Sequence, residues 1–100
     1  METIKFTHNG RDYLYEIISH MVWKEKNILT IMMQECGDNL FKWIKNNSTT
    51  GARHYKADIV LNDENDNSQC FMECSIMDFS YSSVIGAYTV VVSYGDSGGQ

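Results

Sequence analysis

The chain has 100 residues, of which 43% are hydrophobic and 12% aromatic, and its 13 acidic residues outnumber its 8 basic residues to give a net charge of −5. This length corresponds to one domain with a modest core, and the apolar content excludes a disordered chain. Because no basic cluster is denser than Lys24-Glu25-Lys26, a nucleic-acid partner is not expected.

The apolar runs are too short for a membrane helix. No run exceeds three residues, as in Met21–Trp23 and Ile31–Met33, far below the roughly 20 that a spanning helix needs, so no membrane partner is expected. The N-terminal residues lack the basic start and apolar block of a signal peptide. We therefore expect a soluble protein of the cytoplasm, and we expect its three cysteines to be reduced.

Alternation of apolar and polar residues predicts strands in the first third. Ile4 and Phe6 share one face of a strand over 3–7, and Asn9-Gly10 is typical of a tight hairpin turn. A single long second arm is expected from Tyr13 to about Lys24, followed by a polar break over 24–27. The third strand is expected over 28–34, with three apolar residues on one side: Leu29, Ile31 and Met33.

One short helix is expected over 38–46. Asp38 is a good N-cap, and apolar residues follow at helical spacing: Leu40, Phe41, Trp43 and Ile44. A surface loop over 47–53 comes next.

Three more strands are expected in the second half, over 55–62, 69–81 and 86–94, with an acidic turn over 63–67. In the long strand we place Cys70, Met72, Cys74 and Ile76 on one face, with a bulge near Asp78. The fold class is mainly β, a two-layer sandwich or small barrel of about six strands with one short helix. Residues 1–94 form the domain, and 95–100 are expected to be a flexible tail.

Gly95-Asp96-Ser97-Gly98-Gly99 spells the pentapeptide around the nucleophilic serine of trypsin-like proteases. We reject that function, because the chemistry needs a histidine base, an orienting carboxylate and an oxyanion hole on a scaffold more than twice this length. Scattered carboxylates give no general acid and base pair either. We expect no enzymatic activity and no catalytic residue.

Metal and cofactor sites are also not expected. Cys70 and Cys74 stand about 13 Å apart along a strand, too far for both thiolates to hold one zinc ion. The segment 63–67 opens like a calcium loop, but Ser68 replaces the required glycine and Cys74 the closing glutamate, so a solvated turn is favoured. The histidines, His8, His20 and His54, show no ligand spacing.

From Leu29 onward the order of elements resembles the tail-tube family, which includes the contractile phage tail tube and the Hcp tube protein of type VI secretion. In that family a strand leads into a short helix with a Leu-aromatic-x-Trp-hydrophobic stripe. Three segments carry the rest of the resemblance, which spans about 29–94: an Ala57–Asp63 strand ending in an acidic turn, the aromatic and hydroxyl residues of Met77–Ser82, and the last strand, Ala87–Ser93.

The resemblance implies a two-sheet fold that assembles into hexameric rings around a lumen. Family members usually carry a longer N-terminal portion that touches the neighbouring ring, so this chain matches the family better for ring formation than for stacking. The implied function is a structural, self-assembling tube or ring subunit of a phage-tail-like or type VI apparatus. Its implied partners are copies of itself and other components of that apparatus, through which export without a signal peptide would occur.

Strands with apolar residues on both faces are hard to cover in so small a domain, and subunit pairing is one way to protect them. The expected interface residues are Ile28, Thr30, Met32, Tyr88, Val90 and Val92. The alternative is a small acidic monomeric binding protein, such as an immunity protein or inhibitor, that docks on a basic partner through Asp63, Glu64 and Asp66.

Overall fold

A computed structural model describes residues 2–8, 10–35, 37, 42, 57–65 and 67–99. For residues 96–99 it describes the backbone only. The strands in this part of the chain are β1 (Thr3–His8), β2 (Arg11–Glu16), β3 (Ser19–Trp23), β4 (Ile28–Met33), β5 (Ala57–Asn62), β6 (Ser68–Ser82), β7 (Ala87–Ser93) and β8 (Asp96–Gly99). A single turn of 3-10 helix, η1 (Lys24–Lys26), joins β3 to β4. The predicted helix over 38–46 lies, except for Lys42, outside the described residues.

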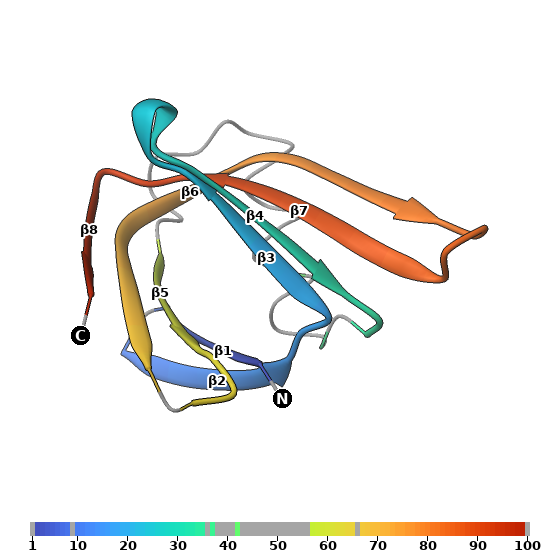
Figure 1. The fold of residues 1–100 in the computed structure, drawn as a ribbon, viewed down its shortest axis with the longest axis horizontal. Helices are drawn as coiled ribbons and strands as arrows, with labels where there is room; N and C mark the ends of the chain where they lie inside the picture. The colour runs from blue at the N-terminus through green and yellow to red at the C-terminus, as the bar shows by residue number, and fades with distance from the viewer. Residues whose placement is uncertain are drawn as a thin grey trace.

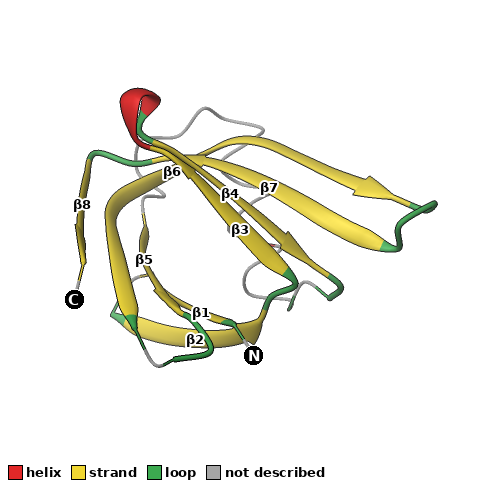
Figure 2. Ribbon diagram, in the orientation of Figure 1, coloured by secondary structure: helices red, strands yellow, loops and turns green. Residues whose placement is uncertain are grey.

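All strand pairs are antiparallel, in the order β2-β1-β5-β6-β7-β4-β3, and β8 also pairs with β6. The ladder folds back on itself into two layers (Figures 1 and 2). Sheet A contains β2, β1, β5, the first half of β6 and β8, whereas sheet B contains β3, β4, β7 and the second half of β6. The predicted mainly β, two-layer fold is therefore confirmed.

The core lies between the two sheets and is built from the inward residues of each strand. Ile4 and Phe6 enter it from β1, as their alternation predicted, and Leu29, Ile31 and Met33 enter it from β4. The remaining fully or nearly fully buried members include Ile59, Leu61, Phe71, Val90 and Val92. Phe71 and Tyr94 meet edge to face with ring centroids 4.9 Å apart. Each inward residue removes apolar surface from water, which is the main source of stability for such a domain.

Strand β6 belongs to both sheets because its backbone bends at Met72 and Glu73. Glu73 adopts a left-handed φ of 56°, and the pairing of β6 with β5 shifts by one residue at this point. The inward alternation therefore changes phase: Phe71 and Cys74 are both fully buried, while Met72 is exposed. The prediction that Cys70, Met72, Cys74 and Ile76 share one face is wrong for this reason, since an inserted residue moves every later side chain to the other face.

A second irregularity in β6 lies where the sequence places it. The pairing of β6 with β7 shifts between Ile76 and Asp78, so the predicted bulge near Asp78 is confirmed. The polar break over 24–27 is also confirmed. It forms η1 and ends at Asn27 with a left-handed φ of 53°.

Two predictions about the chain path are wrong. The expected single arm from Tyr13 to Lys24 is divided at Ile17 and Ile18, where the chain leaves sheet A for sheet B. There the N–H of Ile17 donates to the carbonyl of Glu2, and the N–H of Ile18 donates to that of Met32. The expected flexible tail instead forms β8, because the backbone of 96–99 pairs with residues 69–72 of β6.

Within the described residues, no helix is long and apolar enough to cross a membrane.

Candidate subunit-interaction surface

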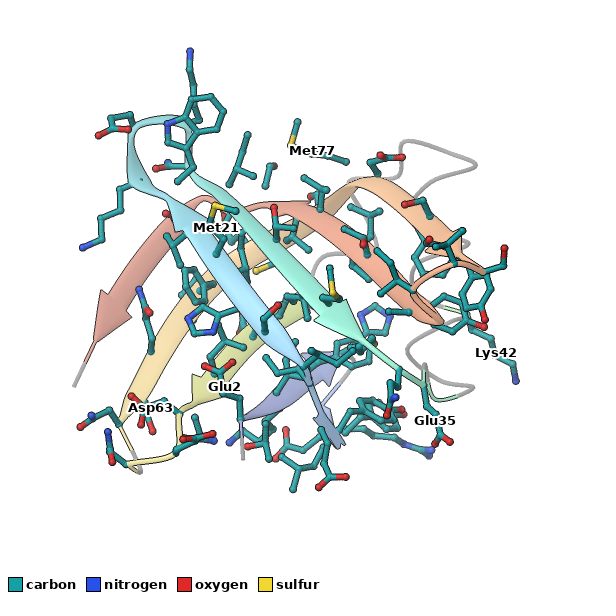
Figure 3. The ribbon with its side chains drawn as sticks, turned by 45° about the vertical axis from the view of Figure 1, so that its right-hand side comes forward. Glu2, Met21, Glu35, Lys42, Asp63 and Met77 are labelled. Carbon is teal, nitrogen blue, oxygen red and sulfur yellow. The ribbon has the colours of Figure 1, made fainter. Side chains whose placement is uncertain are left out.

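The outward side of sheet B carries a group of apolar side chains, set among serine and threonine residues and Asp78, that no described segment covers completely. Directly paired residues of neighbouring strands point to the same side of a sheet, so the register defines this side. Trp23 pairs with Ile28, and Met21 pairs with Thr30, which in turn pairs with Val91. We call these residues, with Met32 and Met77, the outer face: Met21, Trp23, Ile28, Thr30, Met32, Met77 and Val91. Met21 and Met77 project from the upper side of the molecule in Figure 3.

Several outer-face side chains are well exposed. Met21 is 67% exposed, Met77 57% and Trp23 51%. Large apolar side chains gathered on one side of a small domain are typical of a protein contact surface, because single exposed residues are common but contiguous patches are not. Methionine suits such a contact, since its unbranched side chain adapts to different partners.

Both edges of sheet B are unpaired among the described strands. β3 pairs with β4 alone, and beyond Ser75 the strand β6 pairs with β7 alone. An edge strand carries backbone N–H and C=O groups on its outer side that another strand can pair with. The N–H of Phe79, on β6, already donates to Oδ1 of Asp78 at 2.9 Å. Neighbouring strands in the order β3-β4-β7-β6 are antiparallel, so the two edge strands run in opposite directions.

The six residues predicted to form a subunit interface divide into three groups. Ile28, Thr30 and Met32 lie on the outer face and are half-buried, as an interface role requires. Tyr88 is half-buried in an aromatic cluster with Phe79 and Tyr81. Val90 and Val92 are core residues, exposed by 2% and 0%, so this fold leaves their side chains unavailable to a neighbouring subunit. The alternation of Val90 and Val92 along the strand was recognised, but it does not say which face of the strand packs into the core.

Two residues of the alternative acidic site, Asp63 and Glu64, border an open groove of about 920 Å³ between the start of β1, the corner after β2 and the turn after β5. Five carboxylate side chains line it: Glu2, Glu16, Glu35, Asp63 and Glu64. Glu2, Glu35 and Asp63 lie on the lower side of the view in Figure 3, away from Met77. Asp66, the third residue of the predicted docking turn, lies outside the described residues.

Asp63 has a structural role in its turn. Its Oδ1 accepts hydrogen bonds from the backbone N–H groups of Asn65 and Asn67, at 2.8 and 2.9 Å, and its own N–H donates to the carbonyl of Asn67. The hydrogen bonds from Asn67 and Asn65 hold the pKa of Asp63 below its ordinary value of 3.8. These hydrogen bonds form the turn that the sequence predicts between β5 and β6.

One histidine borders the same region. Nδ1 of His20, on β3, lies 2.9 Å from Oε2 of Glu2, which precedes β1, so this contact links sheet B to the start of sheet A. The contact lacks the alignment of a hydrogen bond and is an ion pair only when His20 is protonated. Among the residues that the structure describes, no three His, Cys, Asp or Glu side chains are close enough together to hold a metal ion.

The two described cysteines have different environments. Cys74 is fully buried, and its Sγ lies 3.4 Å from the carbonyl oxygen of Phe71, to which it donates. Burial, and secondarily the negative charge of Asp58, raise the pKa of the Cys74 thiol to about 12. Cys70 is half-buried on the other side of the bend. The change of alternation at Glu73 turns the Cys74 side chain into the core, whereas the Cys70 side chain stays half-buried. The two thiols therefore have different surroundings.

No family model matches the sequence, and no curated protein is significantly similar to it. Comparison of the fold with solved structures is informative. The fold is similar to that of a chain in the anti-feeding prophage baseplate. That structure, determined by cryo-electron microscopy with 6-fold symmetrisation, superposes on this chain with a TM-score of 0.68. The match covers 99% of this chain and 91% of the other, at 8% sequence identity.

The likeness to the anti-feeding prophage chain extends over nearly the whole domain. It includes the first third of the chain, which the sequence resemblance to the tail-tube family, over about 29–94, does not cover. At 8% identity it shows a shared fold, and it does not single out the tube proteins.

Sequence reasoning missed several exposed residues of sheet B. The most exposed apolar side chains include Val84 and Ile85, in the turn between β6 and β7, and Met21 and Met77 on the outer face. Val84 and Ile85 stand between two strand patterns and next to Gly86, which was a usable sign of an apolar turn. Met77 gave no such sign, because the change of alternation at Glu73 is what turns its side chain outward.

Proposed function

We propose that this chain is a structural subunit of a phage-tail-like or type VI secretion apparatus, which assembles with copies of itself into a ring and acts through subunit contacts without catalysis. The proposal is supported by the fold it shares with a chain of the anti-feeding prophage baseplate, an assembly that was symmetrised six-fold. A six-membered ring, stacked into a tube or placed in a baseplate, is the form we propose.

The observation that carries the proposal is that the outer strands of sheet B, β3 and the second half of β6, pair with no further strand of the described residues. In a ring, copies are related by rotation, so each strand keeps its direction along the axis. Because β3 and the second half of β6 run in opposite directions, β6 of one copy would meet β3 of the next as an antiparallel pair. Such heterologous contacts close into a ring and leave no free edge.

The outer face follows from the same arrangement. When the four strands of sheet B join those of the next copy, this side faces either the lumen or an adjacent protein layer. Its methionine and aromatic side chains suit contact with another protein.

Charge substitutions at the two edges test the proposal. Ser19 on β3 and Ser80 on β6 are both exposed and stand in the same row across sheet B, through Met32 and Thr89. We expect the Ser19→Lys, Ser80→Lys variant to remain folded but monomeric, because like charges meet across the new strand pair. The Ser19→Lys, Ser80→Glu variant is the matched control and should retain rings.

Light scattering after size-exclusion chromatography and negative-stain microscopy give the result. Six-fold rings of the unmodified chain, lost in the Lys/Lys variant and retained in the Lys/Glu variant, support the proposal. A strict monomer at high micromolar concentration of the unmodified chain would contradict it.

The groove with five carboxylates favours the second candidate function, a monomeric acidic protein that docks on a basic partner. A double reversal, Asp63→Lys with Asp66→Lys, distinguishes the two functions. It should leave ring assembly unchanged if the turn is only solvated, whereas it should abolish binding of a basic partner if the turn is the docking site.

A further inference from the structure

Beyond the last pair with β4, strands β6 and β7 extend by one further residue pair and a four-residue turn, a short projection that we call the arm. The last pair between β4 and β7 is Met33 with Tyr88, and beyond it β6 and β7 pair only with each other, up to Ser82 with Ala87. The turn over 83–86 closes the arm, with the N–H of Gly86 donating to the carbonyl of Ser82 at 2.7 Å. The arm extends beyond the ends of β3 and β4 at the right of Figure 1.

The end of this arm is apolar and uncharged. Val84 is 96% exposed and Ile85 65% exposed, the first being the most exposed large hydrophobic side chain described. Sixteen consecutive residues, 79–94, carry no charged side chain, in a chain that is 21% charged. Behind the tip, an aromatic cluster stiffens the arm: Phe79 stacks on Tyr88 at 5.5 Å between centroids, and Tyr81 lies 4.8 Å from Tyr88. A stiff arm with a bare aliphatic tip has the features of an inserting element.

The opposite end of sheet B carries an exposed surface of matching chemistry. Trp23 lies beside η1, and its ring nitrogen already donates to Oε2 of Glu25 at 2.9 Å. Burying the indole against an apolar group would therefore leave no unsatisfied donor. Met21 stands in the next row of the same face. Both side chains are more than half exposed, so they have room for a partner.

The tip and this surface cannot meet within one molecule. Trp23 is in the row of Ser93, whereas Val84 lies in the turn beyond Ala87, at the other end of β7, six residues or about 20 Å from Ser93 at roughly 3.3 Å a residue. In Figure 1 the η1 turn is at the upper left and the arm at the right. A projecting element at one end and a receiving surface at the other are the parts of a contact that repeats from copy to copy in one direction.

We infer that Val84 and Ile85 of one copy dock on the Met21 and Trp23 surface of a second copy, joining copies end to end along the strands. This contact is separate from the edge pairing of the proposed ring, and it would join one ring to the next. A single tip buries far less than the roughly 1,200 Å² of a standard stable interface, so the contact is weak alone. Its strength rests on the proposed ring, which would repeat it once per subunit.

A lipid surface fits this arm less well. The outer edge of β6 in the arm has no partner strand among the described residues, and unpaired backbone groups are costly in hydrocarbon. The net charge of −5 also opposes approach to anionic lipids. A protein surface can pair those backbone groups or leave them in water.

Cysteine cross-linking between two differently tagged full-length chains tests the contact even when it is weak. The background carries Cys36→Ser and Cys70→Ser and retains buried Cys74. We expect Val84→Cys mixed with Met21→Cys to form a mixed disulfide dimer on mild oxidation. The control replaces Met21→Cys with Leu14→Cys, because Leu14 is 64% exposed, close to the 67% of Met21, but lies on β2 of sheet A. The first mixture should give at least about ten times more mixed dimer, since a specific contact raises the local thiol concentration. Equal yields in the two mixtures, or a predominance of Val84–Val84 dimers, would overturn the inference.

A second measurement separates this contact from the ring. Ile85→Asp should abolish stacking of rings in electron micrographs while single rings persist, and Leu14→Asp, at nearly the same exposure, should leave stacks intact. If rings form but neither stacking nor the cross-link is seen, the tip contact is wrong and the proposed ring stands. If the cross-link is seen without rings, the proposed ring is wrong and the tip contact stands. Co-sedimentation of the chain with phosphatidylcholine and phosphatidylglycerol vesicles, lost in Ile85→Asp, would assign the tip to a membrane and overturn the inference.

Discussion

The backbone N–H of Glu73 donates to Oδ1 of Asp58, with the nitrogen 3.1 Å from the oxygen, at the point where β6 passes from sheet A to sheet B. This bond holds the bulge that gives one strand to two sheets. Without the bend, the second half of β6 could not pair with β7, so sheet B would lose its fourth strand and β7 would become its edge. The proposed assembly therefore depends on a local backbone feature as well as on the surfaces it exposes.

Replacing Glu73 by glycine tests this bend. Glu73 holds a left-handed φ of 56°, which costs a side-chain-bearing residue roughly 1 kcal/mol and costs glycine nothing. We expect Glu73→Gly to leave the free energy of unfolding unchanged or raise it by up to about 1 kcal/mol. Ser80→Gly, in a regular part of the same strand, should lower it by about 0.5–1 kcal/mol. Urea denaturation of both variants gives the comparison, and equal destabilisation would show that the bend is not as described.

The thiol of Cys74 should be unreactive in the folded protein. It is fully buried, its pKa is raised to about 12, and only the thiolate attacks disulfide reagents. In the background lacking Cys36 and Cys70, we expect reaction with Ellman's reagent at pH 8 only at the rate of unfolding. Adding denaturant should expose the thiol at once. Rapid, stoichiometric reaction under native conditions would contradict the burial of this residue.

Cys74 also predicts a loss of stability at high pH. Its pKa is raised by folding, so the unfolded chain releases the proton first, and the stabilising contribution is complete below about pH 9 and is lost as pH rises toward 12. Cys74→Ala lacks this group. The decline in free energy of unfolding over that interval should therefore be shallower in Cys74→Ala than in the unmodified chain, and parallel curves would contradict the prediction.

Asp63 predicts the opposite dependence at low pH. The hydrogen bonds from Asn67 and Asn65 lower its pKa below 3.8, so the folded chain keeps the carboxylate charged when the unfolded chain has begun to bind a proton. This contribution is present above about pH 4 and is lost as pH falls through the lowered pKa. Asp63→Asn removes it. Thermal unfolding between pH 5 and pH 2 should show a shallower fall in Tm for the variant, while Glu64→Gln, which lacks these bonds, should match the unmodified chain.

Much of the fold could be predicted because alternation along a strand reports which side is buried. The strands with Ile4 and Phe6, and with Leu29, Ile31 and Met33, were found in this way. The corner at Ile17 and Ile18 could not, because β-branched residues continue through it and conceal the change of sheet. The bend at Glu73 gave no sign either, since a glutamate does not indicate a left-handed backbone.

The interaction surface could be predicted only in part. Ile28, Thr30 and Met32 lie on the outward side and stay predicted interface residues, whereas Val90 and Val92 lie in the core, because a strand pattern distinguishes two faces without saying which one meets the core. The strand β8 was missed because glycine, serine and aspartate have low β propensity. Its pairing depends on the neighbouring edge of β6, which is a tertiary effect.

Amide hydrogen exchange on the assembled and monomeric chain tests the edge pairing most directly. The account predicts that assembly slows exchange in β3 (19–23) and in residues 76–82 of β6, and leaves β2 (11–16), the outermost described strand of sheet A, unchanged. Exchange that is the same in both states at β3 and 76–82, or protection that appears at β2 instead, would contradict the assignment of sheet B as the surface that joins one subunit to the next.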